Sequence, residues 1–390
     1  MKILHTGDWH LGHTIYDYER DREQAEMLES VVEIAGREQP DLMLICGDIF
    51  DTSQPSAQSQ RLWADTLVAL RKTAPDMDIV AIAGNHDSPA LLEAYHAPLK
   101  QLGGVILGRI GRNSPPDDFI LEYPGKCFVA AVPYSYTRNT PENLYAGLLE
   151  EIDSRNTDGL PVVIAAHTTV IGSLYEGHRC DRPDGGMEII GGIESMSLAD
   201  FGRGYDYLAL GHIHRPQTLA GSDGRARYSG SPIPMSFDEK YHHGVTIATV
   251  ERGSVPELRM EEIQPLIKFE DIPSGAPASW PEVRSLLEEY PADKDVYIRL
   301  NVKADELLSP VATSEAAMLC KDKKAKFCVV NLIKGETNTA ATTQRGLRVE
   351  EFRQLSPIEI AERYAAERGL PFDDELKSLF NDVVDICHKI

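Results

Sequence analysis

The feature of this chain that most constrains its fold is an apolar run followed at once by polar residues able to bind a ligand. Residues 79–83 form an apolar run typical of a buried strand, and Gly84, Asn85, His86 and Asp87 follow it directly. Ligands of open α/β sheets bind at the carboxyl ends of the strands, and glycine permits the tight turn that such an end requires. The run therefore predicts a strand that carries an amide, an imidazole and a carboxylate at its functional end.

The same arrangement recurs elsewhere along the chain. The polar residues are Asp8 and His10 after residues 2–6, Asp48 and Asp51 after residues 41–46, His167 after residues 162–166, and His212 and His214 after residues 207–210. Each has an ordinary reading when taken alone, since an aspartate after a strand is often a turn or helix cap, and a histidine is often a hydrogen-bonded interior residue. Taken together, these strand ends indicate one shared metal site, because all of them carry metal-ligand residue types.

The spacing of these residues suits a pair of divalent metal ions. Asp8 and His10 lie two residues apart on an extended segment, so their side chains project to the same side, and His212 and His214 repeat this spacing. Asp48 is the natural carboxylate to bridge two ions ~3.5–4 Å apart. Imidazole, carboxylate and amide donors without a thiolate favour manganese, iron or zinc in an open catalytic site.

The composition places the chain among folded proteins with more than one domain. With 390 residues, 42% of them hydrophobic, it can bury a sizeable core and is expected to form two or three domains. No stretch approaches the ~20 continuous apolar residues of a membrane span, and the N-terminus enters a strand without a signal segment, so we expect a cytoplasmic protein. The six cysteines include no CxxC pair and are expected to be reduced core residues.

The formal net charge of −22 weighs against a general affinity for nucleic acid. A DNA substrate would have to be bound through local basic patches, bound divalent cations or the surface of a partner. The lysine-rich run at residues 321–326 is one such patch, although a solvated turn between two elements is the more ordinary reading of these lysines.

The hydrophobic pattern predicts one large α/β domain over residues 1–262. Helical spacing over residues 21–39 and again from Ser56 alternates with strands, as in the strand-helix-strand units of a parallel sheet. A helix is expected near residues 141–153, and strands near residues 162, 208, 228 and 245–250 are expected to complete a second sheet. The two sheets should form a β-sandwich flanked by helices, with their ligand-bearing strand ends at one rim.

Two further regions are expected after this domain. Residues 263–340 begin at a proline-marked loop and alternate helices with strands, which predicts a small α+β domain. Residues 341–390 read as two helices, the first starting at Ser356 with Glu359 at capping-box spacing. These helices need a covering surface, either a partner or the small α+β domain, because they carry more apolar residues than a solvated tail. The apolar residues are Ile358, Ile360, Tyr364, Leu376, Leu379, Phe380 and Val383.

The order of the ligand-bearing motifs resembles that of the calcineurin-like binuclear metallophosphoesterases. The motifs are Asp8-x-His10, Gly47-Asp48, Gly84-Asn85-His86-Asp87, His167 and Gly211-His212-x-His214. Residues 2–12 and 228–239 are similar to stretches of the bacterial double-strand-break-repair nucleases within that superfamily. The resemblance implies a four-layer metallophosphoesterase β-sandwich, a small α+β DNA-capping domain and a C-terminal helix-loop-helix.

Carried onto this chain residue by residue, the resemblance implies ligands for two divalent ions. One ion would be held by Asp8, His10, Asp48 and His214, and the other by Asp48, Asn85, His167 and His212. His86 would face the phosphate as the catalytic residue, stabilising charge or protonating the leaving oxygen. Asp51 is implied to orient His86. For Asp87 two roles stay open: it could support His86, as is implied for Asp51, or it could be a simple turn residue.

The resemblance further implies a manganese-dependent DNA nuclease that hydrolyses phosphodiesters by in-line attack of a metal-bound hydroxide. The implied activities are exonuclease action on duplex ends and endonuclease action on hairpins and single strands, in DNA repair, recombination and replication. The helical tail would bind an ATPase of the structural-maintenance type, in an assembly built on a homodimer of this chain. A metallophosphoesterase for another phosphoester and a non-catalytic scaffold are the alternatives, because a fold does not set its substrate.

Overall fold

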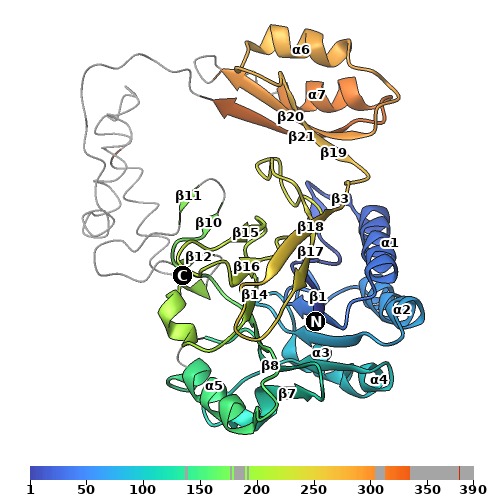
Figure 1. Cartoon of the computed structure of the whole chain (residues 1–390). Helices are drawn as coiled ribbons and strands as arrows, with labels where there is room; N and C mark the ends of the chain where they lie inside the picture. The colour runs from blue at the N-terminus through green and yellow to red at the C-terminus, as the bar shows by residue number, and fades with distance from the viewer. Residues whose placement is uncertain are drawn as a thin grey trace. The chain divides into compact units, whose positions relative to one another are not determined.

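The structure is a computed structural model, and it describes residues 1–136, 139–175, 178–179, 189–190, 193–303, 312–333 and Lys377 (Figure 1). The chain divides into two units, residues 1–334 and residues 335–390. The elements described below all belong to the first unit. The predicted terminal helices of residues 341–390 lie outside the described residues, apart from Lys377.

The first large sheet is built around the apolar strand at the N-terminus, β1, which pairs in parallel with β4 and antiparallel with β17. The six-stranded order is β18-β17-β1-β4-β5-β6, and the bounds are β1 (Lys2–Thr6), β4 (Leu42–Cys46), β5 (Asp78–Ile82), β6 (Gly104–Leu107), β17 (Gly244–Thr249) and β18 (Glu257–Glu262). The prediction that residues 245–250 complete the second sheet is wrong. Their strand lies beside β1, where it removes an exposed edge from the strand that leads to Asp8.

The second large sheet carries the remaining predicted strand ends. Its six-stranded order is β15-β16-β14-β9-β8-β7, and the bounds are β7 (Ile120–Tyr123), β8 (Cys127–Val132), β9 (Val162–His167), β14 (Tyr207–Gly211), β15 (Gln217–Thr218) and β16 (Ala226–Tyr228). β9 pairs in parallel with both β8 and β14. The carboxyl ends of β9 and β14 therefore lie side by side.

Helices cover the outer face of each sheet (Figure 1). The helices are α1 (Asp21–Glu38), α2 (Ala57–Thr73), α3 (Pro89–Ala94), α4 (His96–Gln101) and α5 (Leu144–Arg155). The first four share a core with the first sheet, whereas α5 shares one with the second sheet. The Ser56 hydroxyl accepts a hydrogen bond from the Ser59 N–H at 3.1 Å, which confirms the predicted start of α2.

Several short elements complete the first unit. They are the hairpin β2 (Thr14–Ile15) and β3 (Tyr18–Glu19), the pairs β10 (Leu174–Tyr175) with β11 (His178–Arg179) and β12 (Ile189–Ile190) with β13 (Ile193–Glu194), and 3-10 turns at Pro116–Phe119 and Leu198–Phe201. No helix within the described part of the chain is both long and apolar enough to span a membrane.

The alternation of side chains along β4 explains the layers. Leu42, Leu44 and Cys46 pack between the two sheets, whereas Met43 and Ile45 pack under the helices on the outer face. Both faces of the strand are buried, so its sequence is continuously apolar rather than alternating. The layers run helix, sheet, sheet, helix, which confirms the predicted four-layer β-sandwich flanked by helices.

A smaller α+β region follows the sandwich, and we call it the cap. It contains β19 (Lys268–Ile272), β20 (Val296–Lys303) and β21 (Lys326–Ile333) in parallel, with α6 (Trp280–Glu288) and α7 (Ala312–Cys320). Val283, Leu287, Ile298 and Leu300 belong to a core of its own. The helices and strands predicted here are confirmed, whereas the boundaries at residues 262 and 340 stay predictions.

The cysteines within the described residues are all free thiols. Cys46, Cys127 and Cys320 are buried and Cys328 is half-buried. Burial raises the pKa of the Cys127 thiol to about 12, so this thiol is protonated and behaves as an apolar core group. The prediction of free core cysteines is confirmed for Cys46, Cys127 and Cys320.

One polar pair joins the two sheets inside this apolar interior. His5 of β1 is fully buried, and its Nδ1 lies 2.8 Å from the hydroxyl of Tyr207 on β14. Burial, together with the nearby Arg227 charge, lowers the pKa of His5 from 6.5 to about 3. The neutral imidazole is therefore part of the native core at neutral pH.

Acidification should weaken the fold through His5. Between pH 6.5 and about 3 the unfolded chain binds a proton that the folded chain excludes, so stability falls as the pH falls. The contribution approaches about 1.4 kcal/mol per pH unit. We expect His5→Gln, which keeps a hydrogen-bonding group but does not titrate, to flatten the dependence of the unfolding free energy on pH in urea titrations. Tyr207→Phe, which leaves the imidazole buried, should keep the slope, and equal slopes for His5→Gln and the unchanged protein would contradict the assignment.

Candidate metal centre

Three neighbouring strand ends of the first sheet place one group of predicted ligands. Asp8, Asp48 and Asn85 follow β1, β4 and β5, which are adjacent and parallel. Their turns are tied together, since the Asp8 N–H donates to the Gly47 carbonyl at 2.9 Å and the His10 N–H donates to the Asp48 carbonyl at 3.0 Å. The donors are thus held by main-chain hydrogen bonds rather than by one flexible loop.

The second sheet supplies the facing group of ligands. His167 is the last residue of β9 and pairs with Gly211, the last residue of β14, which precedes His212. The His167 Nδ1–H donates to the Cys46 carbonyl of the first sheet at 2.8 Å. This hydrogen bond crosses from one sheet to the other and joins the two rims.

The main chain at these strand ends is strained. Asp8, His10, Asp48 and His212 have φ angles of 53°, 45°, 49° and 98°. Non-glycine residues rarely adopt positive φ, and such strain persists only where the surrounding structure holds it, commonly at functional sites. The sharp turns bring side chains from separate strands to a common point.

Two glycines allow the close approach of the main chain to this point. A Cβ on Gly211 would lie 1.8 Å from the Cys46 carbonyl oxygen, and a Cβ on Gly84 would lie 2.1 Å from Asp48 Oδ1. Neither gap can hold a methyl group, so it is the lack of space, not a positive φ, that requires glycine at these positions.

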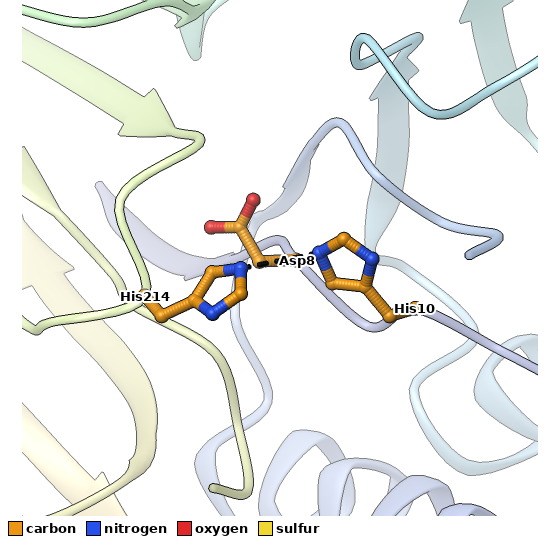
Figure 2. A group of neighbouring side chains, drawn as sticks. All are labelled: Asp8, His10 and His214. Atoms are coloured by element: carbon orange, nitrogen blue, oxygen red, sulfur yellow. Dashed lines mark hydrogen bonds between the residues drawn. The ribbon is translucent and has the colours of Figure 1, made fainter. Parts of the chain in front are cut away.

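The first group of donors contains Asp8, His10 and His214, which Figure 2 shows converging from two segments of the chain. The Nε2 atoms of His10 and His214 lie 3.2 Å apart. His214 Nδ1 lies 3.1 Å from the Glu239 carboxylate, which can only accept, so Nδ1 carries the proton and Nε2 presents a lone pair. Asp8 Oδ2 is buried without a hydrogen-bond partner among the described residues, although Oδ1 accepts from the His212 N–H.

The second group contains Asp48, Asn85, His167 and His212. His167 Nε2 lies 3.0 Å from Asn85 Oδ1 and 3.4 Å from Asp48 Oδ2. Since His167 donates its Nδ1 proton to a carbonyl, its Nε2 also presents a lone pair. Asp48 Oδ2 also lies 3.7 Å from His10 Nε2, so one carboxylate oxygen faces both groups.

These contacts fit a site for cations. Lone pairs of imidazole, amide and carboxylate groups face one another at hydrogen-bond distance, which is repulsive unless a positive charge lies between them. Burial lowers the pKa of His167, but the charges of Asp48 and Asp8 outweigh it and raise that pKa to about 9, so a positive charge at Nε2, from a metal ion or in its place a proton, is favoured. Burial likewise lowers the pKa of His214. The neighbouring carboxylates of Glu239, Asp8 and Asp48 outweigh this effect and raise that pKa to about 9. The donor set matches manganese, iron or zinc in type.

The structure brings together all the residues predicted as metal ligands, and their role as ligands stays a prediction. His86 lies at the same rim but is exposed, and its Nδ1–H donates to the main-chain carbonyl of Asp51 at 2.8 Å. The Asp51 carboxylate instead lies 3.2 Å from His10 Nδ1. Asp51 therefore contacts His86 through its main chain, and its side chain faces a predicted ligand.

Asp87, which the sequence left open, is a turn residue in this structure. Its buried carboxylate accepts hydrogen bonds from the N–H groups of Gly84, Ile49 and Phe50. Burial and the nearby Asp48 raise the pKa of Asp87 to about 6. The side chain links the turn after β5 to the turn after β4.

Sequence reasoning missed two residues that hold predicted ligands in place. Glu239 accepts from His214 Nδ1, as described above, and Gln24 of α1 donates from Nε2 to the His10 carbonyl at 2.9 Å. Glu239 is the last residue of the stretch 228–239, which carries the family resemblance. That position was the one signal in the sequence that could have pointed to Glu239. Gln24 gives no signal, because a glutamine on a helix is ordinary.

A rim of this kind on a two-sheet sandwich is that of a metal-dependent phosphoesterase. The family model described as calcineurin-like phosphoesterase matches residues 1–216 of the chain. The SbcD subunit of the nuclease SbcCD from Rhodobacter capsulatus is 31% identical over 352 residues, which cover 82% of this chain and 84% of the relative. The SbcD proteins of Bacillus subtilis 168 and Escherichia coli K12 are 32% and 28% identical, covering 79% and 80% of this chain and 81% and 80% of those relatives. The chain belongs to the calcineurin-like phosphoesterases and, within them, to the SbcD family of nuclease subunits.

Substituting Gly84 should damage the metal centre while leaving the sandwich folded. In Gly84→Ala the new methyl group must displace Asp48, so we expect affinity for Mn²⁺ to fall about tenfold or more in calorimetric titrations. Gly147→Ala is the matched control, because its Cβ meets nothing within 4 Å on α5 and alanine favours a helix. Unchanged Mn²⁺ affinity in Gly84→Ala would contradict the role of Asp48 as a ligand.

Proposed function

We propose that this chain is a manganese-dependent DNA nuclease with two metal ions at the rim of the sandwich. The observation that carries the proposal is the convergence of imidazole, amide and carboxylate lone pairs at one point between the two sheets. The names of the relatives, which are subunits of the nuclease SbcCD, support the substrate class. The proposed activities are double-strand exonuclease and hairpin or single-strand endonuclease action.

The proposed ligand sets follow the two donor groups. One ion would be held by Asp8, His10, Asp48 and His214, and the other by Asp48, Asn85, His167 and His212, with Asp48 shared. When bound, two such ions would acidify a water molecule and neutralise charge on the phosphate oxygens. The residues around them hold each imidazole in one tautomer, since the Glu239 carboxylate and the Cys46 carbonyl accept the Nδ1 protons of His214 and His167.

His86 is proposed as the catalytic residue that meets the phosphate. It is the exposed imidazole at a rim where the proposed histidine ligands are more buried, and the Asp51 carbonyl accepts its Nδ1 proton. Its Nε2 is therefore the atom available to hold a proton for the leaving oxygen or to donate to a phosphate oxygen. Asp51 is proposed to orient this ring through its main chain.

The cap is proposed to guide DNA to this rim. The lysine-rich run forms the turn between α7 and β21, where Lys323 donates to the Glu288 carbonyl at 2.9 Å and Lys326 pairs with Asp295. Lys321 and Lys324 are exposed and are the residues of the run proposed to contact phosphates. Because the net charge is −22, most of the DNA-binding surface is proposed to come from the partner and the bound ions.

The proposed partner is the ATPase SbcC, in keeping with the complex named in the relatives. We propose three regions, residues 1–262 for the nuclease, 263–340 for the DNA cap and 341–390 for binding SbcC. We further propose a homodimer of this chain within a heterotetramer, acting in the cytoplasm in DNA repair and recombination. The apolar residues of the predicted terminal helices support this assignment, because such helices need a covering surface.

The function is tested on a blunt DNA duplex, a DNA hairpin and a generic aryl phosphodiester, each with Mn²⁺. We expect both DNA substrates to be cleaved, and we expect His86→Ala to keep the full Mn²⁺ content while its DNA cleavage rate falls about 100-fold or more. His242→Ala removes an exposed histidine outside the rim and should cleave DNA normally.

Three results would contradict parts of this proposal. Cleavage of the aryl ester without cleavage of DNA would rule out the substrate. Full turnover by His86→Ala would rule out the catalytic role. Loss of one ion in His86→Ala would show that His86 is a metal ligand. Its position near His10 and Asp48 is compatible with that role.

Removing residues 351–390 should separate the chain from its partner. We expect the shortened chain to keep Mn²⁺ binding and aryl phosphodiester cleavage, because the rim lies within residues 1–334. Co-purification with SbcC should be lost, as measured by pull-down from cells that express both proteins. An intact complex would assign the interface to another part of the chain.

A further inference from the structure

We propose that a buried ion pair at the start of α1, Arg20 with Glu23, is a positioning element that couples the cap to one of the two metal sites. The inference rests on the proposed function, because it takes His10 and His214 as ligands of the same ion. The pair joins Tyr297 of the cap to both of these histidines through separate chains of hydrogen bonds.

The pair itself is completely buried and geometrically defined. The Arg20 guanidinium donates to Glu23 through Nε at 3.1 Å and through Nη2 at 2.9 Å, and both side chains are 1% exposed or less. A buried ion pair gains little stability over an apolar pair of the same volume, because both charges lose their water. Its use is then to hold several neighbouring groups in one fixed arrangement, as a planar bidentate pair can.

The cap contacts this pair through one phenol. Tyr297 of β20 is buried, and its hydroxyl donates to Glu23 Oε1 at 2.6 Å. The Arg20 guanidinium also lies over the ring of Phe269 on β19, 5.7 Å from its centroid. Two strands of the cap sheet therefore meet the ion pair directly.

One branch leads from the ion pair to His10. Gln24 follows Glu23 on α1, and its N–H donates to the Arg20 carbonyl at 2.9 Å. Its side-chain amide donates to the His10 carbonyl and accepts from the Gly12 N–H, both at 2.9 Å. The amide thus clamps the strained turn that carries His10.

The other branch leads to His214. Arg20 Nη1 donates to the Pro234 carbonyl at 2.9 Å, and the next residue, Met235, donates its N–H to Glu239 Oε2 at 3.0 Å. Glu239 Oε1 in turn lies 3.1 Å from His214 Nδ1. The two branches meet at one metal site, since His10 Nε2 and His214 Nε2 lie 3.2 Å apart.

Two proposed ligands of the other site, His167 and Asn85, are held differently. His167 is anchored by the Cys46 carbonyl, and Asn85 lies on the turn that Asp87 fixes to the turn after β4. These contacts lie within the sandwich and include neither the ion pair nor the cap. A change at Tyr297 should therefore weaken one metal site and spare the other.

Titration of the full-length protein with Mn²⁺ tests this coupling. In Tyr297→Phe, which loses only the hydroxyl, we expect the affinity of one of two sites to fall about three- to tenfold by calorimetry, since partners of metal ligands commonly change affinity on this scale. At limiting Mn²⁺ the electron paramagnetic resonance spectrum should shift from a coupled pair toward a single ion.

Tyr18→Phe is the matched control at the same contact. Tyr18 lies beside Tyr297, with ring centroids 6.0 Å apart, and donates to the Phe327 carbonyl of the cap at 3.1 Å rather than to the ion pair. It should bind Mn²⁺ as the unchanged protein does. Equal weakening in both variants would show a general loosening of the cap and would overturn the proposal.

A double-mutant cycle tests whether Tyr297 acts on the metal site through Gln24. Gln24→Ala removes the clamp on His10, and Tyr297→Phe in that background should weaken Mn²⁺ binding by less than it does alone. Full additivity, or unchanged affinity in Tyr297→Phe, would overturn the coupling through α1. Absence of Mn²⁺ binding by the unchanged protein would instead overturn the proposed function, so the two failures are distinguishable.

Discussion

The hydrogen bond from His167 Nδ1 to the Cys46 carbonyl is the interaction on which the candidate metal centre depends. It spans 2.8 Å between the last residue of β4 in one sheet and the last residue of β9 in the other. The close approach is possible because Gly211, paired with His167, presents no side chain to the same carbonyl. The bond also sets the tautomer of His167, so the imidazole turns a lone pair toward Asp48 and Asn85.

Strain and burial at the rim are explained by this meeting of two sheets. Each sheet alone ends in turns that could relax, but hydrogen bonds between the sheets hold the turns, such as that from the His212 N–H to Asp8 Oδ1. The residues with a positive φ at these strand ends, Asp8, His10, Asp48 and His212, are all residues whose side chains enter the shared site. The apolar core between the sheets supplies the stability that keeps these conformations in place.

The sandwich and its donors could be predicted from sequence because the relevant signals are local. Apolar runs such as residues 79–83 predict buried strands, and a polar residue after each run falls at the carboxyl end whatever the strand order. The position of β17 could not be predicted, because its apolar run fits either sheet and only long-range pairing with β1 decides between them. For the same reason Gln24 and Glu239 escaped assignment, since their partners are remote in the chain or lie on other elements.

The sequence by itself determined the chemistry of this protein, namely which residue types arrive at strand ends and in which order, because these follow from local pattern and spacing. The tertiary structure decided how those residues are held. It made Asp87 a turn residue, aimed the Asp51 carboxylate at His10 rather than His86, and placed the Arg20 and Glu23 pair between the cap and the rim. These outcomes depend on distances between segments far apart in the chain, and such distances are set by packing of the sheets and helices rather than by any local property of the sequence.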